Sequence, residues 1–138
     1  MRKIYLFALL ALLLATGCRA APSTLATQVA QYQNDVGKLA VKWARHIELA
    51  KITENDALSP VIAILQEDQQ EFMFLAVPEP LKGSRDSVEA SMQEIIEILK
   101  ILKNSKEEII TGYGSPIGVA RTRFSYEYNW IMTYQATP

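Results

Sequence analysis

One histidine and one acidic cluster are the residues best suited to acid–base or metal chemistry. His46 is the only histidine, so the chain cannot supply the paired histidines of a bundle di-iron site. We interpret His46 as a partly buried residue with a hydrogen-bond partner. Glu67, Asp68 and Glu71 lie close together, and we interpret them as a solvated helix face. We therefore expect no metal, no cofactor and no enzyme, whereas carboxylates converging on His46 would favour catalysis.

A second group of chemically capable residues alternates near the C-terminus. Arg121, Arg123, Tyr126 and Trp130 combine guanidinium groups with rings that stack on bases or sugars or anchor protein interfaces. Nucleic acid is disfavoured, because 14 basic and 15 acidic residues leave a net charge of −1. The simpler alternative is that the aromatic residues of this segment close the protein core. These four residues are our candidate interaction surface, for a protein or a glycan.

The single cysteine, Cys18, lies too early in the chain to be an obvious nucleophile in a folded site. Arg2 and Lys3 precede an uncharged apolar run over residues 4–15. Two cations followed by about a dozen apolar residues are the layout of a secretory signal. The run is too short for a membrane-spanning helix, which needs about 20 residues.

The end of this run, LATGC at residues 14–18, resembles the lipobox of bacterial lipoproteins. In that family a diacylglycerol is attached to the cysteine sulfur, and the signal is cut immediately before the cysteine. The resemblance implies a signal peptide over 1–17, a tether over 18–24 and a covalent lipid on Cys18. Many lipoboxes carry leucine where Ala15 stands here. The alternative is an ordinary signal cleaved a few residues later.

The same resemblance predicts where the protein lies. Arg19 follows Cys18, whereas aspartate at that position tends to retain enterobacterial lipoproteins at the inner membrane. We therefore expect an extracytoplasmic, lipid-anchored protein. It would lie at the outer membrane of a cell with two membranes, or on the outer face of a single cell membrane.

Apolar residues recur at alternating steps of three and four along three segments, as in amphipathic helices. The spacing predicts helices over about 25–52, from 59 until Pro78 and Pro80, and from about 80 to 103, with a short helix over 105–111. Ser23 or Thr24 can cap the first helix, and Ser59-Pro60 can start the second. The predicted core positions are Leu25, Val29, Tyr32, Val36, Leu39, Trp43, His46 and Ala50, then Ile62, Leu65, Phe72 and Ala76, then Leu81, Val88, Met92, Ile95, Leu99 and Leu102.

The last segment fits two periods. As a helix, begun by Ser115-Pro116, it gathers Ile117, Ala120, Phe124, Tyr128 and Ile131 on one face. Strict alternation from Phe124 to Tyr134 is the period of a strand. We favour the helix because no partner strand is evident, and an unpaired strand leaves its backbone groups unsatisfied. The predicted fold is all-α: a small antiparallel bundle of about four helices over 25–138, with a C-terminal strand as the alternative.

These features favour a non-enzymatic, membrane-tethered envelope lipoprotein that acts through protein contacts. The alternative is a small-molecule or glycan binding module built on the bundle. Exposure of Tyr126 and Trp130 would favour the first, and a closed apolar cavity lined by Trp43 and Phe72 the second. The expected partners are the membrane, through the anchor, and an envelope protein. The helix stripes are most simply an internal core, and the alternative is a seam shared with another subunit.

Overall fold

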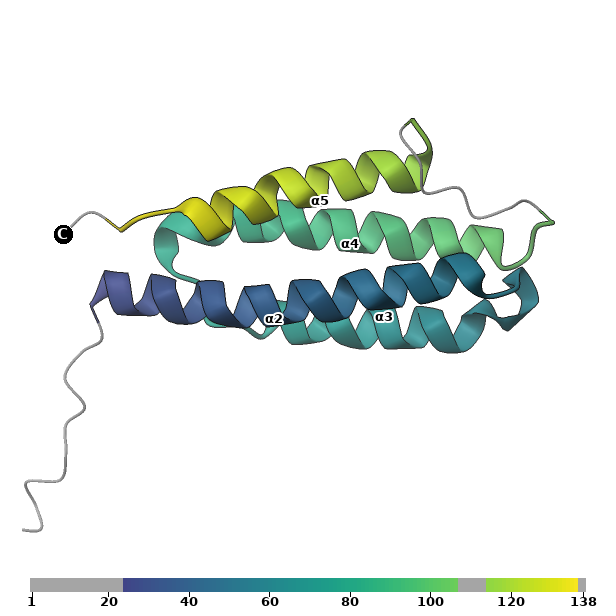
Figure 1. Ribbon diagram of the computed structural model, residues 1–138, viewed down its shortest axis with the longest axis horizontal. Coiled ribbons are helices and arrows are strands. Elements are labelled where there is room, and N and C mark those ends of the chain that lie inside the picture. The colour runs from purple at the N-terminus through teal and green to yellow at the C-terminus, as the bar shows by residue number, and fades with distance from the viewer. Residues whose placement is uncertain (1–23, 107–113, 137–138) are drawn as a thin grey trace, which may run out of the picture.

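The computed structural model describes residues 24–106 and 114–136, and it confirms an all-α helical bundle (Figure 1). The elements are α2 (Leu25–Ile52), η1 (Asn55–Ala57), α3 (Leu58–Met73), η2 (Glu79–Leu81), α4 (Lys82–Leu102) and α5 (Pro116–Thr133). No strand occurs in the described ranges, so the helical interpretation of the last segment is confirmed. The predicted signal, Cys18, the tether up to residue 23, and most of the short helix predicted over 105–111 lie outside the described residues.

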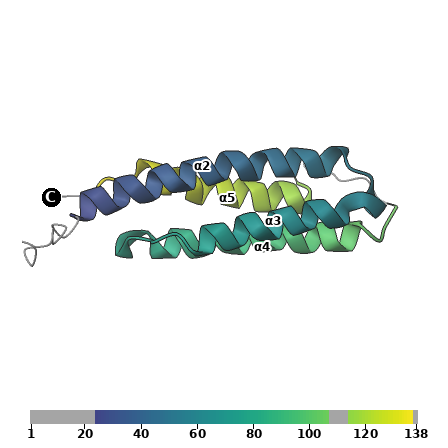
Figure 2. The same ribbon diagram turned by 90° about the horizontal axis from the view of Figure 1, so that it is seen from below.

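The four α-helices run roughly along one axis, each opposite in direction to the one before (Figures 1 and 2). The most extensive packing is between α4 and α5; α2 packs on α3 and α3 on α4. The contact between α2 and α5 is the smallest of these, so the bundle is least tightly closed along that side. This arrangement leaves one long flank of α5 without a neighbouring helix.

Helix α2 follows its predicted stripe closely. Thr24 is the N-cap, and its side chain accepts a hydrogen bond from the backbone of Thr27. Leu25 was predicted in the core but is exposed, because the first turn of α2 extends beyond the end of α3 (Figure 1). The side chain of His46 is only partly buried, and the adjacent Ile47 is fully packed in the core.

Helix α3 begins and ends earlier than the sequence predicted. It starts at Leu58 with Ala57 as its N-cap, because the turn η1 leads directly into it, so Ser59 lies inside the helix. It ends at Met73, several residues before the prolines that were expected to stop it. Ala76 therefore lies beyond the helix and is exposed, which corrects its predicted place in the core.

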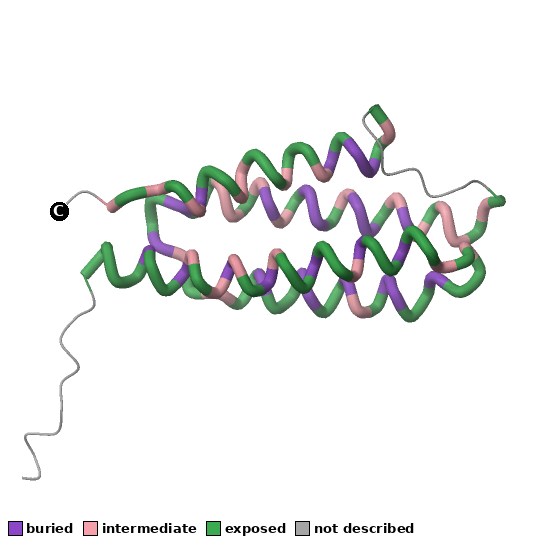
Figure 3. The backbone as a smooth tube through the Cα atoms, viewed as in Figure 1, coloured by how far each residue is buried: buried purple, intermediate pink, exposed green. Residues whose placement is uncertain are grey.

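The remaining helices complete one apolar core, whose buried positions face the bundle interior (Figure 3). The predicted positions of α4 are buried, except that Leu102 is partly exposed. Helix α5 begins as predicted: Ser115 is the N-cap, accepting from the backbone N–H of Gly118 at 3.0 Å, and Pro116 is the first helical residue. Gly114, just before this cap, has φ of +85°, a conformation that glycine adopts without strain.

Candidate functional site

The outer side of α5 carries three of the four residues that the sequence proposed as an interaction surface. Tyr126 and Trp130 are 72% and 55% exposed. They are four residues apart and therefore lie one above the other on the helix. Val119, Thr122 and Arg123 are exposed on the same side of the helix. We call the side formed by these five residues the outer face of α5.

The fourth candidate, Arg121, lies elsewhere. Arg121 lies on the opposite flank of α5, where its guanidinium is 3.6 Å from the carboxylate of Glu48 on α2. Arg123 instead pairs with Glu94 on α4, with a nitrogen–oxygen distance of 2.7 Å. Both arginines are thus fixed to neighbouring helices, but only Arg123 borders the exposed rings. The structure separates two residues that lie side by side in the sequence pattern.

An open hollow lies beside Tyr126 on the outer face of α5. Its volume is about 450 Å³. Glycines and short side chains make it possible, since a long residue at those positions would fill it. The residues around it are Gly114, Gly118, Val119, Thr122, Arg123 and Tyr126. The outer face thus combines the exposed indole of Trp130 near one end with an open depression near the other.

The other aromatic residues of α5 point into the bundle. Phe124 stacks on Trp43 of α2, with ring centroids 6.4 Å apart and planes inclined by 14°. Tyr128 stacks on Phe124 at 6.2 Å and 12°. These distances are typical of favourable offset stacking. The aromatic segment therefore has two roles: Phe124 and Tyr128 help to close the core, and Tyr126 and Trp130 do not.

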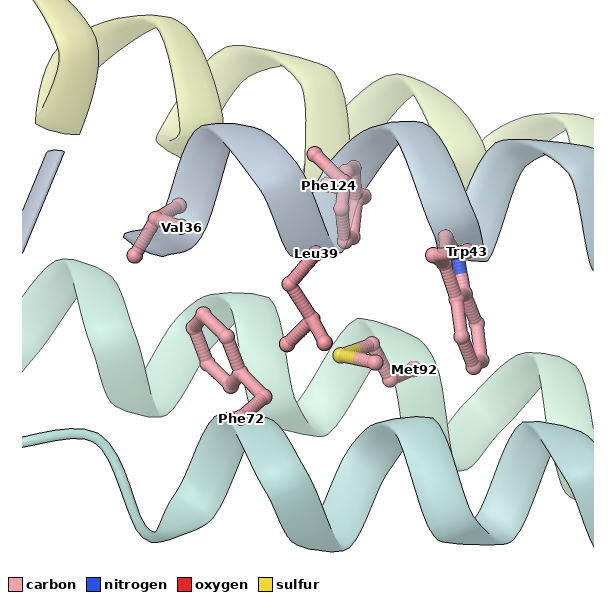
Figure 4. A pocket seen from close by; sticks show the side chains of 7 residues that line it. Val36, Leu39, Trp43, Phe72, Met92 and Phe124 are labelled. Carbon is pink, nitrogen blue, oxygen red and sulfur yellow. The ribbon is translucent and has the colours of Figure 1, made fainter. Parts of the chain in front are cut away.

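The apolar cavity that would favour a ligand-binding bundle is very small. Trp43, Phe72 and Phe124 line it together with Met92, and Figure 4 shows their side chains converging. Its volume is about 10 Å³. A cavity of that size holds at most about one water molecule. The interior of the bundle is therefore filled by side chains at this point.

The acidic cluster of α3 is not a uniformly solvated face. Asp68 is fully buried, whereas Glu67 and Glu71 are exposed. The predicted solvated face is therefore wrong for Asp68. The helix itself explains the difference, since steps of three and four residues lead from buried Leu65 through Asp68 to buried Phe72.

Asp68 is held by two basic residues of α2. The ring nitrogen Nδ1 of His46 lies 2.5 Å from Oδ2 of Asp68, which confirms the predicted hydrogen-bond partner for His46. An ionised carboxylate only accepts hydrogen bonds, so Nδ1 is the donor. Lys42 places Nζ 2.9 Å from Oδ1 of Asp68 and 2.7 Å from Oε2 of Glu71. The contact with Oδ1 is an ion pair by distance but is too poorly aligned for a hydrogen bond.

The two carboxylates in turn change the pKa of Lys42. The hydrogen bond to Glu71 and the negative charge of Asp68 raise the pKa of the Lys42 ammonium above its ordinary value. A histidine oriented by a buried carboxylate is also the base arrangement of hydrolytic enzymes. Here the charge of Asp68 is shared with Lys42, and within the described ranges no three histidine, cysteine or acidic residues are grouped to hold a metal ion. The contacts account for the cluster as a polar link between α2 and α3.

A second buried polar group lies near the start of α4. The Tyr32 hydroxyl is buried and has no hydrogen-bond partner in the described part of the chain. Burial raises the pKa of Tyr32 to about 12, an effect that the nearby charge of Arg85 partly opposes. The ring completes the core, and its hydroxyl contributes no stabilising bond there.

Comparison with known proteins identifies no relative. No protein-family model matches the chain, and neither a curated protein nor a solved structure matches it. None of the helices in the described residues is long and apolar enough to span a bilayer. Any function must therefore be inferred from the residues themselves.

Proposed function

We propose that this protein is a membrane-tethered lipoprotein of the cell envelope that acts by binding another protein through the outer face of α5. The observation that supports this most directly is the exposure of Tyr126 and Trp130 on one helix face, with an open hollow beside Tyr126. Tyrosine, tryptophan and arginine are the residues most enriched at energetically dominant positions of protein interfaces. All three occur together on this face.

The core does not require these side chains. Phe124, Tyr128 and Ile131 supply the inward packing of the same helix turns. Exposed aromatic residues add nothing to the burial of apolar surface within the monomer. A function in contact with another molecule accounts for them, whereas the apolar cavity lined by Trp43 and Phe72 offers a ligand only about 10 Å³.

The membrane tether is the second part of the proposal and rests on the lipobox resemblance at residues 14–18. Two or more acyl chains give stable anchoring, since each buried methylene contributes about 0.8 kcal/mol. Only residues 19–23 separate Cys18 from the capped start of α2. Such a short connection would present the bundle close to the membrane surface.

The interface is tested by photo-crosslinking in intact cells. A benzophenone amino acid replaces Trp130 in the full-length protein, and in a matched control it replaces Val41, which is 54% exposed on α2. We expect a discrete protein adduct from position 130 and none from position 41. Equal labelling from both positions, or none from either, would contradict an interface on α5.

The anchor is tested separately by Cys18→Ser. We expect loss of fatty acid label and loss of membrane retention in detergent-free fractionation, with unchanged helical circular dichroism of the folded domain. Arg19→Asp is the matched control, since it keeps the sulfur. In an enterobacterial host it should retain the lipid but remain at the inner membrane. Fatty acid incorporation by Cys18→Ser would refute the anchor.

A further inference from the structure

The outer face of α5 has features that complement each other. Its depression is lined by Gly118, Val119 and Thr122 among others, and the exposed indole of Trp130 lies about ten residues further along the helix. At 1.5 Å per residue the two are about 15 Å apart along the axis. A knob and a hollow on one helix face cannot meet within one chain. They meet twice if two copies of the face pack antiparallel.

Given the proposed interface on α5, on which this inference rests, we propose that the protein it binds is a second copy of the same chain. A two-fold axis perpendicular to α5, at the level of residue 125, places Trp130 of each copy over the hollow of the other. The interface is then isologous: every contact occurs twice, as in most closed dimers.

The charges of α5 fit the same register. Arg123 lies two residues before the axis and Glu127 two residues after it. Both lie toward the α4 flank of the helix, where Arg123 already pairs with Glu94. An antiparallel pair related by this axis brings each Arg123 beside the partner copy's Glu127. Opposite charges thus meet at two symmetric points along this flank, one on each side of the axis, whereas a parallel arrangement would leave them in different registers.

Tyr126 occupies the centre of this arrangement. It is one residue from the level of the axis, so the rings of the two copies meet in the middle of the interface. A central aromatic residue flanked by charged pairs at the rim is the usual anatomy of a protein interface. The apolar surface of Val119, Tyr126 and Trp130 is then buried in the dimer and not in the monomer.

The crosslinker at position 130 distinguishes the possible occupants of the face. We expect an adduct of twice the chain mass, with the crosslinked peptide mapping to residues 117–122 of the second copy. An adduct with a different protein would overturn self-association and leave the proposed interface standing. Labelling of lipid alone, or no adduct, would overturn both.

A charge-reversal experiment tests the register. Arg123→Glu and Glu127→Arg each place like charges together at two symmetric sites, and we expect each to lower the yield of the double-mass adduct about fivefold or more. Coexpression of the two single variants, each carrying the crosslinker, restores opposite charges at both sites and should recover the adduct between the differently tagged chains.

The control for this experiment is Arg121→Glu, which reverses a charge on the same helix but on the flank toward α2. It should leave the double-mass adduct unchanged. If the coexpressed variants fail to recover the adduct, or if Arg121→Glu lowers it equally, the antiparallel pairing is refuted. Circular dichroism of each purified variant verifies that the helices are intact.

Discussion

Replacing Asp68 with asparagine should destabilise the bundle mainly by weakening the contact with His46, and less by weakening the contact with Lys42. Asp68→Asn keeps the shape of the side chain and removes its charge. The amide oxygen of asparagine can still accept from His46, so a bond to a charged group, typically worth about 1.5–3 kcal/mol, becomes a neutral bond worth about 0.5–1.5 kcal/mol. Lys42 is 46% exposed and keeps its 2.7 Å contact with Glu71, so its loss should be below about 1 kcal/mol.

These values predict that Asp68→Asn lowers the free energy of unfolding by about 1–2 kcal/mol. Natural domains are stable by only about 5–15 kcal/mol, so the effect should be readily measurable. Urea titration of the full-length protein, followed by helical circular dichroism, gives the free energy for each variant. Double-mutant cycles with His46→Gln and Lys42→Met then separate the two contacts.

The cycle should give a coupling energy of about 1–1.5 kcal/mol between Asp68 and His46, and a smaller one between Asp68 and Lys42. Glu71→Gln is the control, because Glu71 is an exposed acidic residue that shares Lys42. It should cost less than about 1 kcal/mol. A coupling near zero for the histidine pair, or a larger one for the lysine pair, would refute the assignment of the buried contact as the main stabilising link.

Two further substitutions test the folded core and a helix start. Tyr32→Phe should raise the free energy of unfolding at neutral pH by about 1 kcal/mol, because it removes a buried hydroxyl that makes no bond. The pKa of Tyr32 is raised from 10.0 to about 12 in the folded protein, so the free energy of unfolding is unaffected by this group below pH 10 and falls as the pH rises from 10 to 12. In Tyr32→Phe, urea titrations should show a smaller loss of stability over this pH range. An unchanged pH profile would count against the burial of the hydroxyl. Ser115→Ala removes the acceptor for the backbone N–H of Gly118 and should lower the free energy of unfolding by about 1 kcal/mol. Hydrogen exchange should become faster only in the first turn of α5. Thr122→Ala leaves that cap in place and should not accelerate exchange there.

Most of the fold could be predicted because each helix repeats one simple pattern. The apolar residues of the stripe from Val29 to Ala50 and of the stripe from Leu81 to Leu99 are buried, since steps of three and four keep them on one side of a helix, and only His46 in the first stripe is partly exposed. The boundaries of α3 were less predictable. Whether Ala57 or Ser59 caps it depends on the short turn η1, whose geometry is a property of the connection with α2 and not of local propensity.

The buried carboxylate was missed for a different reason. Aspartate is almost never fully buried unless it is paired, so residue type alone places Asp68 on the surface. Its position between Leu65 and Phe72 pointed the other way, and that periodicity was the available signal. The partner residues were not predictable from spacing, because Lys42 and His46 reach Asp68 from another helix. Pairing across helices depends on rotation and register, which only the packed structure specifies.

The ambiguity of the last segment has a physical explanation that bears on function. Alternation of aromatic residues is normally evidence for a strand, yet α5 is a helix. In a helix, two residues correspond to a rotation of about 200°, and four residues to little more than one full turn. Alternating aromatics therefore fall in pairs on opposite sides: Phe124 with Tyr128 inside, and Tyr126 with Trp130 outside. A helix needs only the inner pair to pack. The outer pair is unexplained by folding, which is why the outer face of α5 is the part of this molecule where a partner should be sought.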